Sequence, residues 1–205
     1  MKQYNPLSFA DIVQILQDYP DVYIITDTKE TDAKVVKEQF TYIRDQVNQV
    51  DPELIDRIIP EIYSPEMMGI VDKIIPFKHQ IFSIYLSSMT PYEVVQYVKN
   101  NNLSVVAMPV ERATPDFIRN LRNAGAVTYI HSLNTVDEAE QYKNMGVHGF
   151  YTDFLTYEDL NIDTSSWTAA AFKAEPAIRV QDFYMASIIA QATGIPITET
   201  LTQLK

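Results

Sequence analysis

The sequence predicts an α/β fold in which short strands alternate with amphipathic helices around a parallel sheet. Six short runs rich in valine, isoleucine, tyrosine and phenylalanine recur along the chain, and after the first interval their centres lie about 22 residues apart. The runs are almost continuously apolar, which is typical of parallel strands that helices cover on both faces. We therefore expect strands near residues 22–27, 58–64, 81–87, 104–110, 126–131 and 148–153.

The longest helical pattern lies between the first two of these runs. Residues 33–49 place apolar side chains three or four positions apart, which puts them on one face of a helix. We expect this face to pack against the sheet through Val36, Phe40, Ile43 and Val47.

Local signals mark the ends of three further helices. Thr90 is a favourable N-cap for a helix over residues 91–100, whose first residue is a proline, and Thr114 precedes a proline in the same way. A third helix is expected over residues 133–145, with Gly146 as its C-cap. Each predicted helix therefore follows a predicted strand.

The short, even repeat favours a (β/α)8-type barrel. A doubly wound sheet is the alternative, but a dinucleotide-binding sheet of that type carries a glycine-rich turn after its first strand. The chain has 5 glycines among its 205 residues and no such turn. This length is sufficient for one domain with a substantial core, with or without an appendage.

Composition limits the classes of partner. A net charge of -11 argues against nucleic acid or an anionic membrane as the main partner, although a locally positive pocket is still able to bind a small phosphate ester. The chain has no cysteine, which excludes disulfides and cysteine-ligated zinc. No apolar run approaches the ~18 residues needed to span a bilayer. Because the start lacks a signal-peptide pattern, the cytoplasm is the default expectation, with the compartment otherwise undetermined.

The first predicted strand ends in a carboxylate and an ammonium group, on Asp27 and Lys29. If the strand extends through them, its alternation places both side chains on the same side. A carboxylate there can hold a divalent cation and the lysine can neutralise a phosphate. The alternative is an acid and a base that simply pair with each other in solvent.

Three segments resemble glycerophosphodiester phosphodiesterases, in the family's order and spacing. Asp27-Thr28-Lys29 resembles the Glu-x-Lys that ends the family's third strand, and Gly146–Asp153 resembles its closing Gly-Val-Asp-Gly-x-x-Thr-Asp. Tyr129–Asn134 lies where the family has Trp-Thr-Val-Asn. The resemblance covers roughly residues 7–156, and it implies a metal-dependent phosphoric diester hydrolase of glycerophosphodiester or lipid metabolism.

The family's first motifs do not occur in this chain. The His-Arg-Gly strand, the Glu-x-Asp strand and the His-Asp pair supply the family's acid–base histidines and most of its metal ligands. The resemblance therefore implies an incomplete barrel of about six strand–helix units over residues 1–156, followed by an extension over residues 157–205. Full family activity is not expected of this chain alone.

The resemblance also implies roles for individual residues. Asp27 is expected to be a ligand of Ca²⁺ or Mg²⁺, held weakly or not at all by this chain alone, and Lys29 is expected to neutralise charge on the phosphate. His131 matches no histidine of the family; it is the candidate acid–base residue because it is a histidine at a strand end, with a hydrogen-bonded packing role as the alternative. The expected substrate is a small phosphodiester.

Other polar residues have structural alternatives. Asn134 is as compatible with capping the next helix as with contacting substrate, and Asp153 lies either at the mouth of the barrel or in a turn. Glu61 shares a strand face with Tyr63, but we expect it early in its strand, away from the catalytic end. Glu111-Arg112 is expected to form a loop ion pair.

Three classes of function stay open. The first is a metal-dependent phosphodiesterase, active either as this chain or once another polypeptide completes the barrel. The second is a noncatalytic barrel remnant or a binding module. The third is a barrel enzyme of the orotidine-phosphate decarboxylase type, because residues 27–32 also match its Asp-x-Lys-x-x-Asp, although no glycine-rich phosphate turn accompanies them.

The strand–helix repeat stops after Thr156. Residues 176–194 have a pattern compatible with a helix that ends at Gly194. An incomplete barrel leaves an open strand edge and apolar surface. We therefore expect either a covering element from the C-terminal extension or self-association.

Overall fold

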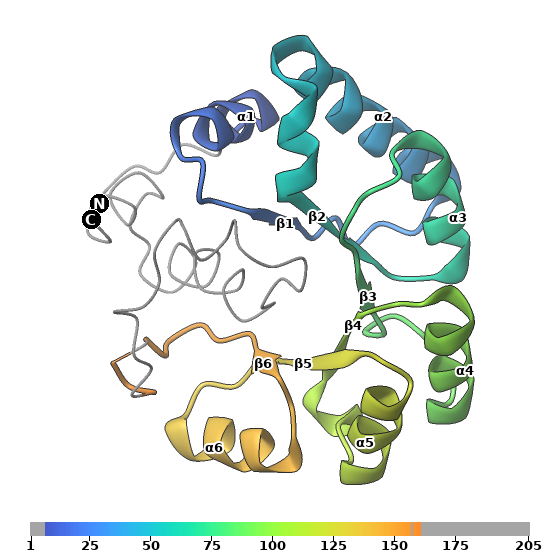
Figure 1. Cartoon of the computed structure of the whole chain (residues 1–205), viewed down its shortest axis with the longest axis vertical. Coiled ribbons are helices and arrows are strands. Elements are labelled where there is room, and N and C mark those ends of the chain that lie inside the picture. The colour runs from blue at the N-terminus through green and yellow to red at the C-terminus, as the bar shows by residue number, and fades with distance from the viewer. Residues whose placement is uncertain (1–6, 157, 161–205) are drawn as a thin grey trace. The chain divides into compact units, whose positions relative to one another are not determined.

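The computed structural model describes residues 7–156 and 158–160, and the chain divides into two compact units, residues 1–80 and 81–205. In both units strands alternate with helices and neighbouring strands are parallel (Figure 1). The fold class is therefore α/β, an incomplete barrel of the TIM type with six strands in the described part of the chain. This confirms the predicted fold class.

Unit 1 contains two parallel strands and the helices that pack on them. Its register pairs Ile24 with Ile58 and Thr26 with Pro60. Figure 1 shows the helices on one side of the strand pair. In chain order the elements are α1 (Phe9–Asp18), β1 (Ile24–Thr26), α2 (Ala33–Val50), the 3-10 helix η1 (Pro52–Arg57), β2 (Ile58–Ile62) and α3 (Pro65–Ile74).

Unit 2 contains four parallel strands in sequence order. Figure 1 shows α5 and α6 on the same side of the sheet. In chain order the elements are β3 (Ile81–Ser83), α4 (Pro91–Asn101), β4 (Val105–Pro109), the 3-10 helix η2 (Val110–Arg112), α5 (Pro115–Asn123), β5 (Val127–His131), α6 (Val136–Met145) and β6 (Gly149–Phe150).

The buried face of α2 is the one predicted. Its apolar positions are Val36, Phe40, Ile43 and Val47, each buried, and α2 packs between α1 and α3. The helix begins at Ala33 because the Asp32 side chain accepts hydrogen bonds from two backbone N–H groups of its first turn. Burial of side chains of this size stabilises the fold by roughly 1.5–3 kcal/mol each.

Most helix ends in unit 2 follow the predicted signals. Thr90 caps α4 in a capping box with Glu93, and Thr114 caps α5. Gly146 ends α6 with a φ of 92°, a left-handed conformation that favours glycine. The predicted start of α6 was wrong, because Thr135 is its N-cap and the helix begins at Val136.

All six predicted strands are present, but most are shorter than expected. The first ends at Thr26 and the second at Ile62, where the chain turns toward the next helix. Two helices, α1 and α3, were not predicted. Both begin at a serine N-cap, Ser8 and Ser64, whose side chain accepts a hydrogen bond from the first turn.

An arginine holds the loop after β3. Arg112 Nη1 donates to the backbone oxygens of Ile84 and Ser87 at 2.9 and 2.8 Å, and Nη2 donates to that of Met89 at 2.5 Å. The main contacts of Arg112 are therefore backbone carbonyls and not the expected ion pair, and Glu111 acts on the guanidinium group only through its charge. In the described part of the chain, no helix combines the length and the apolar character needed to cross a membrane.

We predict that Arg112→Met lowers the free energy of unfolding by about 1–3 kcal/mol, because it removes charged donors from three loop carbonyls. Urea unfolding measures this change. The control is Arg119→Met, which removes an exposed arginine paired with Asp116 and is expected to change stability by about 0.5 kcal/mol or less. Equal losses in the two variants would contradict the role given to Arg112.

Candidate functional site

The candidate site lies in the loop after β1. Because β1 ends at Thr26, Asp27 and Lys29 follow the strand instead of belonging to it. Lys29 has a φ of 50°, and its Nζ lies 3.5 Å from Asp27 Oδ2. Strand alternation, the predicted reason for the approach of the two side chains, is therefore wrong. A left-handed turn, and not a strand, accompanies their close approach.

This ion pair is open to solvent. The side chain of Lys29 is 65% exposed and that of Asp27 is 44% exposed. An exposed pair of this kind contributes only about 0–1 kcal/mol, so a ligand that offers a better partner to either group displaces it at little cost. The pair is thus accessible to a small charged solute.

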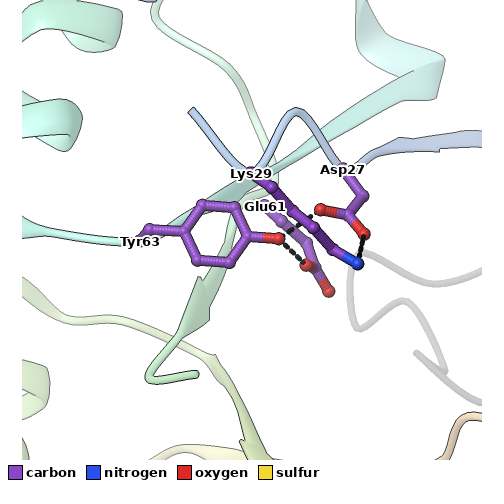
Figure 2. Close-up of polar contacts among 4 residues, drawn as sticks. All are labelled: Asp27, Lys29, Glu61 and Tyr63. Carbon is purple, nitrogen blue, oxygen red and sulfur yellow. Dashed lines mark hydrogen bonds and ion pairs between the residues drawn. The ribbon is translucent and has the colours of Figure 1, made fainter. Parts of the chain in front are cut away.

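A buried tyrosine joins the Asp27 loop to β2 (Figure 2). The Tyr63 hydroxyl donates a hydrogen bond to Asp27 Oδ1 and lies 2.9 Å from Glu61 Oε2. Tyr63 and Glu61 are 2% and 5% exposed. A phenol has one hydrogen, so the two carboxylates compete for it unless Glu61 carries a proton of its own.

The environment keeps Tyr63 protonated. Burial raises its pKa above the ordinary value of 10.0, and the charge of Glu61 and the hydrogen bond to Asp27 raise the pKa further. Tyr63 is therefore a hydrogen-bond donor at neutral pH. Its donation holds one oxygen of Asp27 toward β2 and leaves the other oxygen beside Lys29.

Sequence patterns alone did not predict that Glu61 and Tyr63 belong to this site. Glu61 was expected early in its strand, but β2 ends at Ile62, so Glu61 lies at the carboxyl end. The register that pairs Thr26 with Pro60 brings the next residues, Asp27 and Glu61, to the same edge. The sequence feature that could have indicated this site is the spacing of two residues between Glu61 and Tyr63, which puts both on one face of the strand. It points to Asp27 only once the register of β1 and β2 is known.

The site offers a divalent cation few protein ligands. Ca²⁺ takes six to eight oxygen ligands, and Mg²⁺ keeps several waters beside one or two carboxylates and phosphate oxygens. Asp27 and Glu61 supply two carboxylates close to one hydroxyl group. Within residues 7–156 and 158–160, no group of three or more histidine, cysteine, aspartate or glutamate side chains is suited to holding a metal ion.

His131 ends β5 in unit 2, whereas Asp27 and Lys29 belong to unit 1. Its ring contacts those of Tyr85 and Tyr151, with centroid distances of 5.4 and 5.6 Å and edge-to-face geometry. The packing alternative for His131 thus has ring contacts to support it. An acid–base role stays a prediction.

Asn134 and Asp153 bind each other across two loops. Asn134 Oδ1 accepts from the Asp153 backbone N–H at 2.9 Å, and its Nδ2 donates to Asp153 Oδ2 at 3.3 Å. The capping alternative for Asn134 is wrong, because Thr135 caps α6. These bonds join the loop after β5 to the loop after β6, and a place for Asp153 at the mouth of the barrel stays a prediction.

The backbone and the packing explain why glycine stands at positions 146 and 149 of the closing motif. Gly146 forms the left-handed C-cap of α6. A Cβ atom on Gly149 would overlap with Cε1 of the buried Tyr129 ring, so only glycine fits beneath that ring. The motif therefore indicates how β6 packs, and it does not by itself indicate a catalytic group.

Asp32, the last residue of Asp-x-Lys-x-x-Asp, has a capping role. Its Oδ1 accepts from the backbone N–H groups of Lys34 and Val35, both at 3.0 Å. This carboxylate is therefore committed to the start of α2.

The comparisons with known proteins support the fold. No family model and no curated protein matches the sequence. A solved structure of a glycerophosphoryl diester phosphodiesterase, described as putative, from Silicibacter pomeroyi aligns with a TM-score of 0.56 and 14% identity over 70% of this chain. A glycerophosphodiester phosphodiesterase from Parabacteroides distasonis aligns with a TM-score of 0.54 and 12% identity over 71% of this chain.

At these identities the similarity shows a TIM-barrel fold like that of glycerophosphodiester phosphodiesterases. The matches cover 51% of the first protein's chain and 59% of the second's, so this chain spans between half and three fifths of their lengths. The predicted resemblance is therefore confirmed for the fold.

We predict that acid destabilises the protein partly through His148. Burial lowers the pKa of His148 below its ordinary value of 6.5, so the unfolded chain takes up this proton first as pH falls. The free energy of unfolding therefore falls as pH decreases through 6.5 toward the lowered pKa. Urea unfolding at pH values above and below 6.5 should show a larger loss for the wild type than for His148→Gln. Equal losses would contradict this assignment.

Proposed function

We propose that this chain binds a small phosphodiester together with a divalent cation, as a partial barrel of the glycerophosphodiester phosphodiesterase type. One observation carries the proposal. The Asp27 carboxylate, at the carboxyl end of β1, is held by Tyr63 on one oxygen and lies beside the Lys29 ammonium group on the other. In barrels, the loops after the strands are where ligands bind.

Each residue has a distinct role in this proposal. Asp27 and Glu61 would hold Ca²⁺ or Mg²⁺, and Lys29 would neutralise an oxygen of the phosphate. A cation bound there would supply charge stabilisation to the phosphoryl oxygens. Tyr63 is a positioning residue, because it orients the two carboxylates and remains protonated at neutral pH.

Hydrolysis needs more than this loop provides. Cleaving a phosphodiester requires a nucleophile and a proton for the departing alkoxide. Asp27 and Lys29 supply binding and charge, and Tyr63 holds its proton too strongly to be a base at neutral pH. We propose that hydrolysis occurs only when a completing polypeptide contributes the acid and the base.

A noncatalytic binding module is the second candidate. The observation that favours it is the burial of Glu61 and Tyr63, because a buried hydrogen-bonded cluster also stabilises a loop without doing chemistry. The capping role of Asp32 weighs against a decarboxylase of the orotidine-phosphate type, which we place third. Decarboxylation that persists in the presence of a chelator would support that third class instead.

We predict that Asp27→Asn abolishes binding of Ca²⁺ or Mg²⁺ measured by isothermal titration calorimetry. We also predict that Lys29→Met weakens binding of glycerophosphocholine in the presence of the cation by about tenfold, or about 1.4 kcal/mol. Both effects follow from the loss of one charge at the site.

Two variants serve as matched controls. Asp45→Asn removes a half-exposed, ion-paired aspartate of α2, and Lys34→Met removes an exposed, ion-paired lysine of the same helix. Both are expected to bind as the wild type does. Wild-type levels of binding in Asp27→Asn would contradict the proposal. Hydrolysis of bis-p-nitrophenyl phosphate with Ca²⁺ or Mg²⁺, lost in Asp27→Asn, would show that the chain is catalytic without a completing polypeptide.

A further inference from the structure

Three aromatic rings meet at the carboxyl ends of the strands in unit 2. Tyr85 follows β3, His131 ends β5 and Tyr151 follows β6, and the ring of His131 contacts both tyrosine rings. Leu86 and Phe154 are close to these residues in sequence. We call the five residues the aromatic surface.

Much of this surface is exposed to solvent. Tyr85 is 52% exposed, Leu86 is 50% exposed and Phe154 is 71% exposed. Single exposed apolar residues are common on proteins, whereas apolar residues that gather in one region mark sites of interaction. Here the exposed Tyr85 belongs to a cluster of rings in contact with one another, and the exposed Leu86 follows it in the chain.

The loops that carry the surface are held in place. Arg112 binds three backbone carbonyls of the loop that contains Tyr85 and Leu86. The backbone N–H of Tyr151 donates to Ile130 and its carbonyl accepts from Leu133, both at 2.8 Å. A partner that binds here therefore has little backbone to order, which lowers the entropic cost of binding.

The C-terminal part of the chain contains an uncharged, largely apolar segment. Residues 161–205 lie outside the described residues and follow Leu160, which is only a few positions beyond Phe154. From Phe183 to Thr198 the sequence has no charged residue, although the whole chain has a net charge of -11. That stretch includes Ile188 and Ile189 as well as aromatic residues.

We propose that residues 183–198 dock on the aromatic surface of unit 2 in the same chain. The connection from Leu160 is long enough to reach it, since an extended chain spans about 3.3–3.6 Å per residue. A tether of this length also keeps the segment at a high effective concentration, so it outcompetes a second copy in dilute solution. The proposal depends on unit 2 alone and is independent of the proposed function.

Photo-crosslinking in the full-length chain tests this docking. One variant carries p-benzoylphenylalanine in place of Tyr85, and a second carries it in place of Phe154. Each variant is irradiated as an equal mixture of unlabelled (light) and ¹⁵N-labelled (heavy) chains. After irradiation and trypsin digestion, we expect crosslinks to the peptide of residues 180–205 that join light to light and heavy to heavy only. The matched control places the probe at Tyr92, an exposed tyrosine of α4, and should give no such crosslink.

A charge in the segment should abolish the contact. Ile188→Asp is expected to reduce the crosslink from position 85 to the level of the Tyr92 control, whereas Thr202→Asp, outside the uncharged stretch, should leave it unchanged. A probe in place of Phe183 should link in turn to residues 84–87 or 151–154. Mixed light–heavy crosslinks would overturn the proposal in favour of self-association, and crosslinks to neither copy of residues 180–205 would overturn it outright.

Discussion

One buried hydroxyl group joins the two parts of the candidate site. Tyr63 extends from the end of β2 and donates to Asp27, while Glu61 of the same strand lies 2.9 Å from the same oxygen. Because β1 ends at Thr26, the contacts that orient the Asp27 carboxylate are made by side chains. If Tyr63 did not reach Asp27, the exposed ion pair to Lys29 would be too weak to orient the carboxylate.

This constraint also explains the electrostatics proposed for the site. Two carboxylates near one phenol repel each other, and a protonated Tyr63 gives only one hydrogen to share between them. A divalent cation would relieve that repulsion, and Lys29 adds a positive charge on the exposed side. A chain with a net charge of -11 is thus compatible with a small anionic ligand, because the relevant charge is local.

Sequence patterns predicted the features that depend on neighbouring residues. The buried face of α2, from Val36 to Val47, follows from helical periodicity, and the caps at Thr90 and Gly146 follow from local backbone chemistry. The short range of these interactions makes them readable without knowledge of the rest of the fold.

Features that depend on distant contacts were missed. The meeting of Asp27 with Glu61 depends on the register of two strands, and a shift of one residue would turn Glu61 away. The binding of Arg112 to the 84–89 loop joins residues more than twenty positions apart, so the adjacent Glu111 was a misleading partner. The end of β1 was also mispredicted, because the chain turns after Thr26. A left-handed turn at Lys29, and not the alternation of a strand, therefore accompanies the approach of Asp27 and Lys29.

Residue-specific NMR of the side-chain carboxyl carbons tests the central claim most directly. Mg²⁺ and then glycerophosphocholine are added to the full-length chain. The account predicts that the Asp27 and Glu61 signals shift together and saturate with one midpoint, and that the Lys29 Nζ signal shifts when the phosphodiester is added. Small, unsaturable shifts at Asp27 that match those of the exposed Asp45 would contradict it.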